Sequence, residues 1–185
     1  MIEDVLSDAS RRMDKSVEAA KHEFTTIRTG RASAALLDRI QVNAYGSQMP
    51  VNQLATISVP EPRMLTITPF DKGTMKDIER AILESDLGLT PANDGQLIRL
   101  PIPQLTEERR KELVKHVRHM AEEGRVAARN IRRDAIHHLK ELEKGGDVGS
   151  DDVHRAEDRL QKLTDAHTAA IDSALKGKEA EIMEV

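Results

Sequence analysis

Proline placement is the feature that most constrains how this chain of 185 residues can fold. All seven prolines lie between residues 50 and 103, and the flanks 1–49 and 104–185 contain none. Proline lacks an amide proton and its ring clashes with the preceding turn, so it breaks the interior of a helix. The flanks can therefore form long helices, whereas the middle of the chain cannot.

Both flanks carry apolar residues at intervals of three or four, the period of an amphipathic helix. The N-terminal flank predicts one helix that ends near Ile27. A second helix should begin after Thr106, a suitable N-cap, and end at Gly145 and Gly146. A third should begin at Ser150. Because their apolar stripes are narrow, the helices need helical partners, and a three-helix bundle is predicted.

The middle segment has a different pattern, with short alternating or β-branched runs that are typical of strands. We expect four strands and one helix, over residues 40–44, 55–59, 65–69, 97–100 and, for the helix, 71–85. The predicted fold class is α+β: a discontinuous three-helix bundle from residues 1–29 and 105–185, and a small inserted β/α/β domain from residues 31–104.

Two short connections, near residues 29–33 and 101–106, join the predicted domains. Gly30 relaxes one backbone and two prolines stiffen the other, so the pair can act as a hinge of limited freedom or as a fixed elbow. The candidate hinge residues are Arg28, Thr29, Gly30, Arg31, Pro101, Pro103, Gln104, Leu105 and Thr106.

Positive charge gathers on the second predicted helix. The chain has a net charge of −4, yet residues 109–133 hold nine basic and three acidic side chains. Six of the basic residues share one helix face through spacings of four and seven: Lys111, Lys115, Arg118, Arg125, Arg129 and Arg132. Such a row suits phosphate groups, which arginine contacts with two N–H groups at once. The alternative is a solvated face whose cations pair with the acidic third helix.

Several functional classes lack support in the sequence. The chain has no cysteine, which excludes disulfides and thiolate chemistry, and only 2% aromatic residues, which disfavours base stacking on aromatic side chains. Phosphate-loop, serine-hydrolase and zinc-protease motifs do not occur. We therefore expect no enzyme activity, no metal and no cofactor. With no apolar stretch of membrane-spanning length and no targeting segment, we expect a cytoplasmic protein. We also expect it to be a monomer.

Several segments of the chain resemble the bacterial ribosome recycling factor family. They are Thr26-Ile-Arg-Thr-Gly-Arg-Ala-Ser33, Ser85-Asp-Leu-Gly-Leu89, Leu105-Thr-Glu-Glu-Arg-Arg-Lys-Glu-Leu113, Arg125-Val-Ala-Ala-Arg-Asn-Ile-Arg-Arg-Asp-Ala135 and Lys178-Glu-Ala-Glu-Ile-Met183. The segments follow the family order and span essentially the whole chain. One departure is Gln104, which stands where many relatives carry proline.

The resemblance implies an L-shaped protein that splits the post-termination 70S ribosome with elongation factor G and GTP, releasing messenger RNA and deacylated transfer RNA. It implies that the bundle lies on large-subunit ribosomal RNA, with the Arg-Asn-x-Arg-Arg segment in the contact region. The candidate RNA-binding residues are then Arg110, Lys111, Lys115, Arg118, Arg125, Arg129, Arg132 and Arg133. Two alternatives remain: a coiled-coil chaperone or adaptor that binds proteins, and a metal-dependent helical enzyme.

Overall fold

The structure is a computed structural model that describes residues 1–184, and it divides into two compact units. The first unit comprises Met1–Thr29 together with the chain from Thr106 onward, and the second comprises Gly30–Leu105. The first unit is therefore discontinuous in sequence, and the second is inserted into it.

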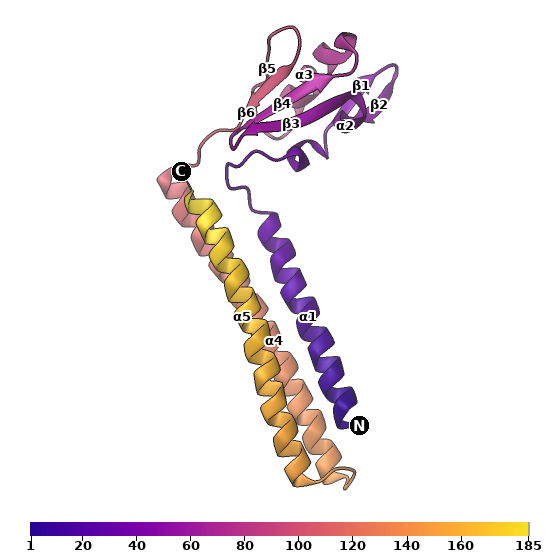
Figure 1. The fold of residues 1–185 in the computed structure, drawn as a ribbon, viewed down its shortest axis with the longest axis vertical. Helices are drawn as coiled ribbons and strands as arrows, with labels where there is room; N and C mark the ends of the chain where they lie inside the picture. The colour runs from indigo at the N-terminus through magenta and orange to yellow at the C-terminus, as the bar shows by residue number, and fades with distance from the viewer. Residues whose placement is uncertain (185) are drawn as a thin grey trace. The chain divides into compact units, whose positions relative to one another are not determined.

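Three long helices form the first unit: α1 (Ile2–Thr25), α4 (Glu107–Lys144) and α5 (Ser150–Met183). They pack side by side along their lengths (Figure 1). This arrangement, with a small sheet-containing unit beside it in the sequence, confirms the predicted α+β class. Helix α1 ends two residues before Ile27, the end that the apolar period predicted.

The ends of α4 follow from local chemistry. The Thr106 side chain accepts a hydrogen bond from the Arg109 amide at 3.1 Å, which satisfies one of the free N–H groups of the first turn. At the other end, Gly146 adopts a φ of +78°, a conformation that glycine enters without steric cost. The Asp147 amide then bonds back to the Leu142 carbonyl at 3.0 Å, so the chain reverses into α5.

The bundle core is built from small and medium apolar side chains that the three helices contribute in layers. Met13, Leu139 and Leu160 are among the largest side chains that are fully buried there. Farther along α4, Gly124 faces both other helices: a Cβ placed on it would lie 3.1 Å from Ile171 Cδ1 and 3.3 Å from Ala20 Cβ. The absence of a side chain at this position therefore lets α1 and α5 approach α4 closely.

The second unit contains two antiparallel sheets. Strands β1 (Gln41–Ala44) and β2 (Ser47–Pro50) form a hairpin. The larger sheet has the order β3-β4-β6-β5, from β3 (Ala55–Glu61), β4 (Met64–Pro69), β5 (Ala92–Asn93) and β6 (Ile98–Pro101). The four predicted strands are present. Strands β2 and β5 were not predicted, because β2 lacks apolar alternation and β5 has only two residues.

Four short helical segments complete this unit: η1 (Ala34–Leu37), α2 (Val51–Leu54), η2 (Lys72–Thr74) and α3 (Met75–Glu84). Helix α3 buries Met75, Ile78 and Ile82 in the core of the unit. The single helix predicted over 71–85 is thus a turn of 3₁₀-helix followed by an α-helix. Asp71 begins it, and its carboxylate accepts a hydrogen bond from the Gly73 amide at 2.9 Å.

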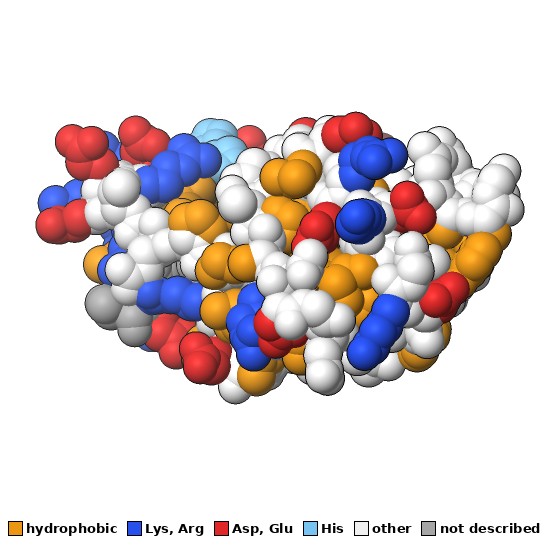
Figure 2. Space-filling model, turned by 90° about the horizontal axis from the view of Figure 1, so that it is seen from above, with side chains coloured by type: hydrophobic (Ala, Val, Ile, Leu, Met, Phe, Trp, Pro, Cys, Tyr) orange, Lys and Arg blue, Asp and Glu red, His pale blue; other side chains and the backbone are white. Residues whose placement is uncertain are grey.

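Some large apolar side chains of the small unit remain exposed. Tyr45 and Phe70 are each 69% exposed, and Leu83 is 60% exposed. Figure 2 shows exposed hydrophobic side chains among interspersed positive and negative ones on the face seen from above. Within residues 1–184, no helix has an apolar stretch long enough to cross a membrane.

Candidate nucleic-acid interface

The basic residues of α4 lie on a face turned away from the bundle core. Leu113, Val117 and Ile131 mark the buried side of the helix. At 3.6 residues per turn, most of the candidate cations project within about 60° of a single line on the other side. These are Lys111, Lys115, Arg118, Arg125, Arg129, Arg132 and Arg133.

Arg110 stands apart from this set. It is partly buried, and its Nε atom lies inside the protein without a hydrogen-bond partner among residues 1–184. The structure therefore gives Arg110 a setting different from that of the other candidates.

Carboxylates already engage some of the cations at the first half of α4. Lys111 Nζ lies 3.1 Å from Glu107 Oε1, one turn earlier on the same helix. Arg118 Nε donates to Glu179 Oε1 of α5 at 2.6 Å, and this hydrogen bond raises the pKa of the Arg118 guanidinium. The Arg118 pair matches the alternative interpretation, in which α4 cations pair with acids of the third helix, whereas the Lys111 pair lies within α4 itself.

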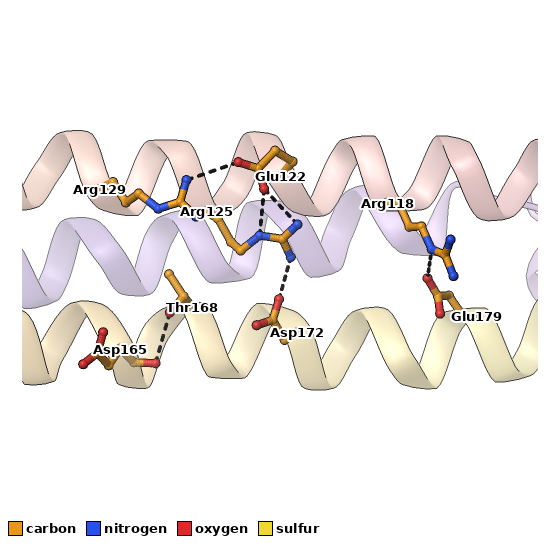
Figure 3. A network of polar contacts seen from close by, with 8 residues as sticks. All are labelled: Arg118, Glu122, Arg125, Arg129, Asp165, Thr168, Asp172 and Glu179. Atoms are coloured by element: carbon orange, nitrogen blue, oxygen red, sulfur yellow. Dashed lines mark hydrogen bonds and ion pairs between the residues drawn. The ribbon is translucent and has the colours of Figure 1, made fainter.

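A larger ionic network surrounds Glu122 (Figure 3). Its Oε2 atom accepts from Arg125 Nε at 3.0 Å, and its Oε1 atom accepts from Arg129 Nη1 at 3.1 Å. The two arginines lower the pKa of the Glu122 carboxyl, the bond from Arg125 contributing most. Arg125 also bridges to α5, where Asp172 Oδ1 accepts from its Nη1 atom at 2.5 Å.

Glu122 interrupts the row of cations on α4 with a negative charge. It lies three residues before Arg125 and seven before Arg129, so it projects from the same face as the basic residues. In the sequence analysis, Glu122 was one of the three acids of residues 109–133, but it was not placed on the face of the basic residues. The face therefore alternates between cations that are paired with carboxylates and cations that are not.

Arg132 and Arg133 make no ion pair among the residues that the structure describes. Arg133 is exposed and Arg132 is partly exposed. Together with Arg125 and Arg129 they line a hollow of about 430 Å³ between α4 and α5. The α5 side of the hollow is lined by Gln161, Thr164, Asp165, Thr168 and Asp172. The guanidinium groups of Arg132 and Arg133 can bind an anionic group on the α4 side of this hollow, whereas the carboxylate of Asp165 makes its α5 side less favourable to an anion.

Lys115 likewise makes no ion pair within residues 1–184 and is exposed. It lies on the same face as Arg132 and Arg133, several turns closer to the start of α4. The cations of this face that make no ion pair within residues 1–184 are thus Lys115, between the paired Lys111 and Arg118, and Arg132 and Arg133 at the C-terminal end of the row.

The candidate hinge residues lie where hydrogen bonds tie each unit down. On one side, Thr29 Oγ1 donates to Glu181 Oε1 at 2.9 Å within the bundle. On the other, the amides of Ala32 and Ile102 donate to the carbonyls of Pro62 and Arg63, at 2.7 Å and 2.8 Å. Both connections are therefore fastened to the same β3–β4 turn of the small unit.

Between these ties, the chain passes through Gly30–Arg31 on one strand and Pro103–Leu105 on the other. Gly30 has a φ of +77°, and a Cβ placed on it would lie 3.4 Å from the Pro103 carbonyl oxygen. The two connections thus run next to each other.

A metal site has no counterpart in residues 1–184, where no group of three or more His, Asp or Glu side chains is arranged to hold an ion. The Nε2 atom of His119, on the surface of α4, lies 2.9 Å from Glu123 Oε1.

The family model described as "Ribosome recycling factor" matches residues 20–183. The ribosome-recycling factor of Rubrobacter xylanophilus is 62% identical over 180 residues, covering 97% of each chain.

Two solved structures are also similar. A solution structure of the ribosome recycling factor has a TM-score of 0.73 and 44% identity, covering 100% of this chain and 98% of that one. A second comes from models for the T. thermophilus ribosome recycling factor and the E. coli elongation factor G bound to the E. coli post-termination complex. Its TM-score is 0.63 and its identity is 45%, with both chains covered completely.

The helical bundle, the small sheet unit and these matches define a non-enzymatic translation factor. More particularly, the chain belongs to the ribosome recycling factor family, which confirms the resemblance of its sequence segments. Its function is ribosome recycling.

Proposed function

We propose that this chain acts with elongation factor G and GTP to split the post-termination ribosome into subunits, freeing messenger RNA and deacylated transfer RNA. Family membership supports the role, and a structurally similar factor has been placed with elongation factor G on a post-termination complex. The chain itself breaks no covalent bond. Its role is to bind the ribosome and to transmit the force that the GTP cycle of elongation factor G supplies.

The bundle docks on large-subunit ribosomal RNA through the cationic face of α4. The observation that carries this assignment is the pair Arg132 and Arg133, which lines a hollow beside Arg129 and makes no ion pair within residues 1–184. Guanidinium groups without carboxylate partners are available to phosphate oxygens, which they bind with two parallel hydrogen bonds. The contacts are to the RNA backbone, because the chain has so few aromatic side chains for stacking on bases.

The docked bundle then serves as a lever. Helix α4 has 38 residues, which at 1.5 Å per residue corresponds to about 57 Å. The small unit receives the push from the partner factor, and the connections near residues 29–33 and 101–106 act as the hinge. The ties at Thr29, Ala32 and Ile102 support a narrow pivot at Gly30–Arg31 and Pro103–Leu105. The factor works as a cytoplasmic monomer.

A paired charge reversal tests the docking face. In Arg132→Glu/Arg133→Glu, ribosome binding should fall by at least tenfold, because two phosphate contacts are lost and two repulsions are gained. The dependence of log affinity on log salt concentration should also flatten by about one to two. Binding is measured by pelleting with vacant 70S ribosomes over a KCl series, and splitting by light scattering with elongation factor G and GTP.

Lys15→Glu is the control, since Lys15 is exposed on α1 and its replacement changes the net charge in the same direction. Helicity of every variant is checked by circular dichroism. Affinity of the double variant equal to that of the control would remove the α4 face from the proposal.

A further inference from the structure

Glu122 sits among the arginines of the proposed docking face and uses both of its carboxylate oxygens on them (Figure 3). Oε2 holds Arg125, through Nε at 3.0 Å and Nη2 at 2.9 Å. Oε1 holds Arg129 at 3.1 Å. One acid on the face thus engages two of its guanidinium groups.

The two arginines differ in how completely they are engaged. Arg125 has Nε, Nη1 and Nη2 all in ion pairs, two with Glu122 and one with Asp172. Its side chain is only 20% exposed. Arg125 therefore fastens α4 to α5, and little of it can reach a ligand.

Arg129 has only its Nη1 atom bonded to Glu122, and its side chain is 47% exposed. It also lines the same hollow as Arg132 and Arg133. A guanidinium group binds carboxylate and phosphate through the same planar arrangement of N–H donors. Glu122 and a phosphate therefore compete for this edge of Arg129.

We infer that Glu122 is an internal competitor of RNA, whose carboxylate must give up Arg129 before that residue can bind a ribosomal phosphate. The inference rests on the proposed function, because it takes the α4 face as the docking surface. Binding to RNA then exchanges one anion for another at Arg129. The exchange lowers the affinity of the docked state and speeds release of the factor once the subunits have separated.

The competition also predicts the response to salt. A protein that neutralises phosphates releases their condensed cations, which makes binding weaken as salt increases. When Arg129 leaves Glu122, the freed carboxylate attracts a cation from solution, which offsets part of that release. Removing the charge of Glu122 should therefore make the salt dependence steeper.

The experiment uses the full chain with the substitution Glu122→Gln and measures pelleting with vacant 70S ribosomes over a KCl series. Exposed ion pairs typically stabilise by a fraction of a kcal/mol, so we expect the affinity to rise about two- to fivefold. The slope of log affinity against log salt concentration should steepen by up to about 0.9.

Glu123→Gln is a matched control, because it removes the same charge from the adjacent residue. Glu123 is exposed and faces His119 rather than the arginines. A gain confined to Glu122→Gln separates competition at Arg129 from the general effect of a less negative protein. In the double variant Glu122→Gln/Arg129→Gln, the gain over Arg129→Gln alone should vanish.

Equal ribosome affinity of Glu122→Gln and Glu123→Gln would overturn the inference. Weaker ribosome binding by Glu122→Gln would also overturn it, because Glu122 would then be positioning the arginines for docking. The charge reversal at Arg132 and Arg133 separates this outcome from failure of the proposed function. If that reversal weakens binding while Glu122→Gln gives no gain, only the competitor role is lost. If the reversal has no effect, the docking face itself is wrong.

Discussion

Enlarging Gly124 tests whether close helix approach holds the bundle together. Gly124 lies in the interior of α4, where glycine costs about 0.8–1.0 kcal/mol relative to alanine. A second helical glycine, Gly177 of α5, provides the control, since a Cβ placed on it meets no atom within 4 Å. On helix propensity alone, alanine should stabilise the protein by the same amount at both positions.

Packing makes the two positions differ. At Gly124 the new Cβ would lie 3.1 Å from Ile171 Cδ1 and 3.3 Å from Ala20 Cβ, both closer than ordinary contact. Ile171 can shift the end of its side chain, but Ala20 can move only with the backbone of α1. Overpacking of this kind costs about 1–3 kcal/mol, against which burying one more carbon returns about 0.8 kcal/mol.

We therefore expect Gly177→Ala to raise the free energy of unfolding by about 0.8–1.0 kcal/mol. Gly124→Ala should lack most or all of that gain, because the propensity and burial terms are offset by the clash. Leucine has nearly the same helix propensity as alanine, so Gly124→Leu should isolate the volume effect and destabilise the protein by about 3 kcal/mol or more. Gly177→Leu should stay close to Gly177→Ala.

The assay is guanidinium denaturation followed by far-ultraviolet circular dichroism, which mainly reports the three long helices. Gly124→Leu should also loosen the ion pair between Arg125 and Asp172, since these residues follow Gly124 and Ile171 directly. Equal or greater stabilisation by alanine at Gly124 than at Gly177 would refute the packing argument.

Two further predictions concern the hinge and Asp94 in the loop between β5 and β6. Gly30→Ala places a Cβ at a φ of +77°, which costs about 1–2 kcal/mol. This variant should split ribosomes more slowly in light scattering but still pellet with them. The control Gly46→Ala has the same φ but lies in a hairpin turn, and it should leave both splitting and pelleting unchanged. Unaltered splitting by Gly30→Ala would argue against a pivot there. Hydrogen bonds from the Leu97 and Gln96 amides, with a further one from Arg99, lower the pKa of Asp94 from 3.8 to about 2. The carboxylate therefore stabilises the small unit above pH 4, and this contribution is lost as the pH falls through about 2; the amide proton shifts of Gln96 and Leu97 should titrate near pH 2, and a midpoint near 4 would contradict the assignment.

Much of the fold could be predicted because its determinants are local. The apolar period marked the three long helices, and Thr106 and Gly146 marked the two ends of α4. The small unit was harder to predict. Strand β5 is only two residues long and depends on pairing with β6, so its own sequence carries little signal.

In the candidate site, too, some features follow from local sequence and others from the packing of distant segments. Spacing of seven and four placed the cations on one helix face, because a helix fixes the direction of each side chain. Spacing also suffices to place Glu122 beside Arg125 and Arg129, but it could not identify the carboxylates that α5 contributes. Asp172 lies 47 residues from Arg125 and Glu179 lies 61 residues from Arg118, so the pairing is set by how α5 packs against α4.

The sequence by itself determined the class of fold, the interruption of the bundle by a small unit and the helix that carries the positive charge. Those features follow from where proline is absent and from which residue types recur along a helix. Glu122 and Arg129 lie on the same helix seven residues apart, so the sequence alone suffices to place them on one face. Only the tertiary structure decided that Arg125 bridges α4 to α5 through Asp172, and that Arg132 and Arg133 line an open hollow. The physical reason is that an ion pair between helices depends on the distance and rotation of the two helices, which follow from packing along the whole bundle, including the close approach at Gly124.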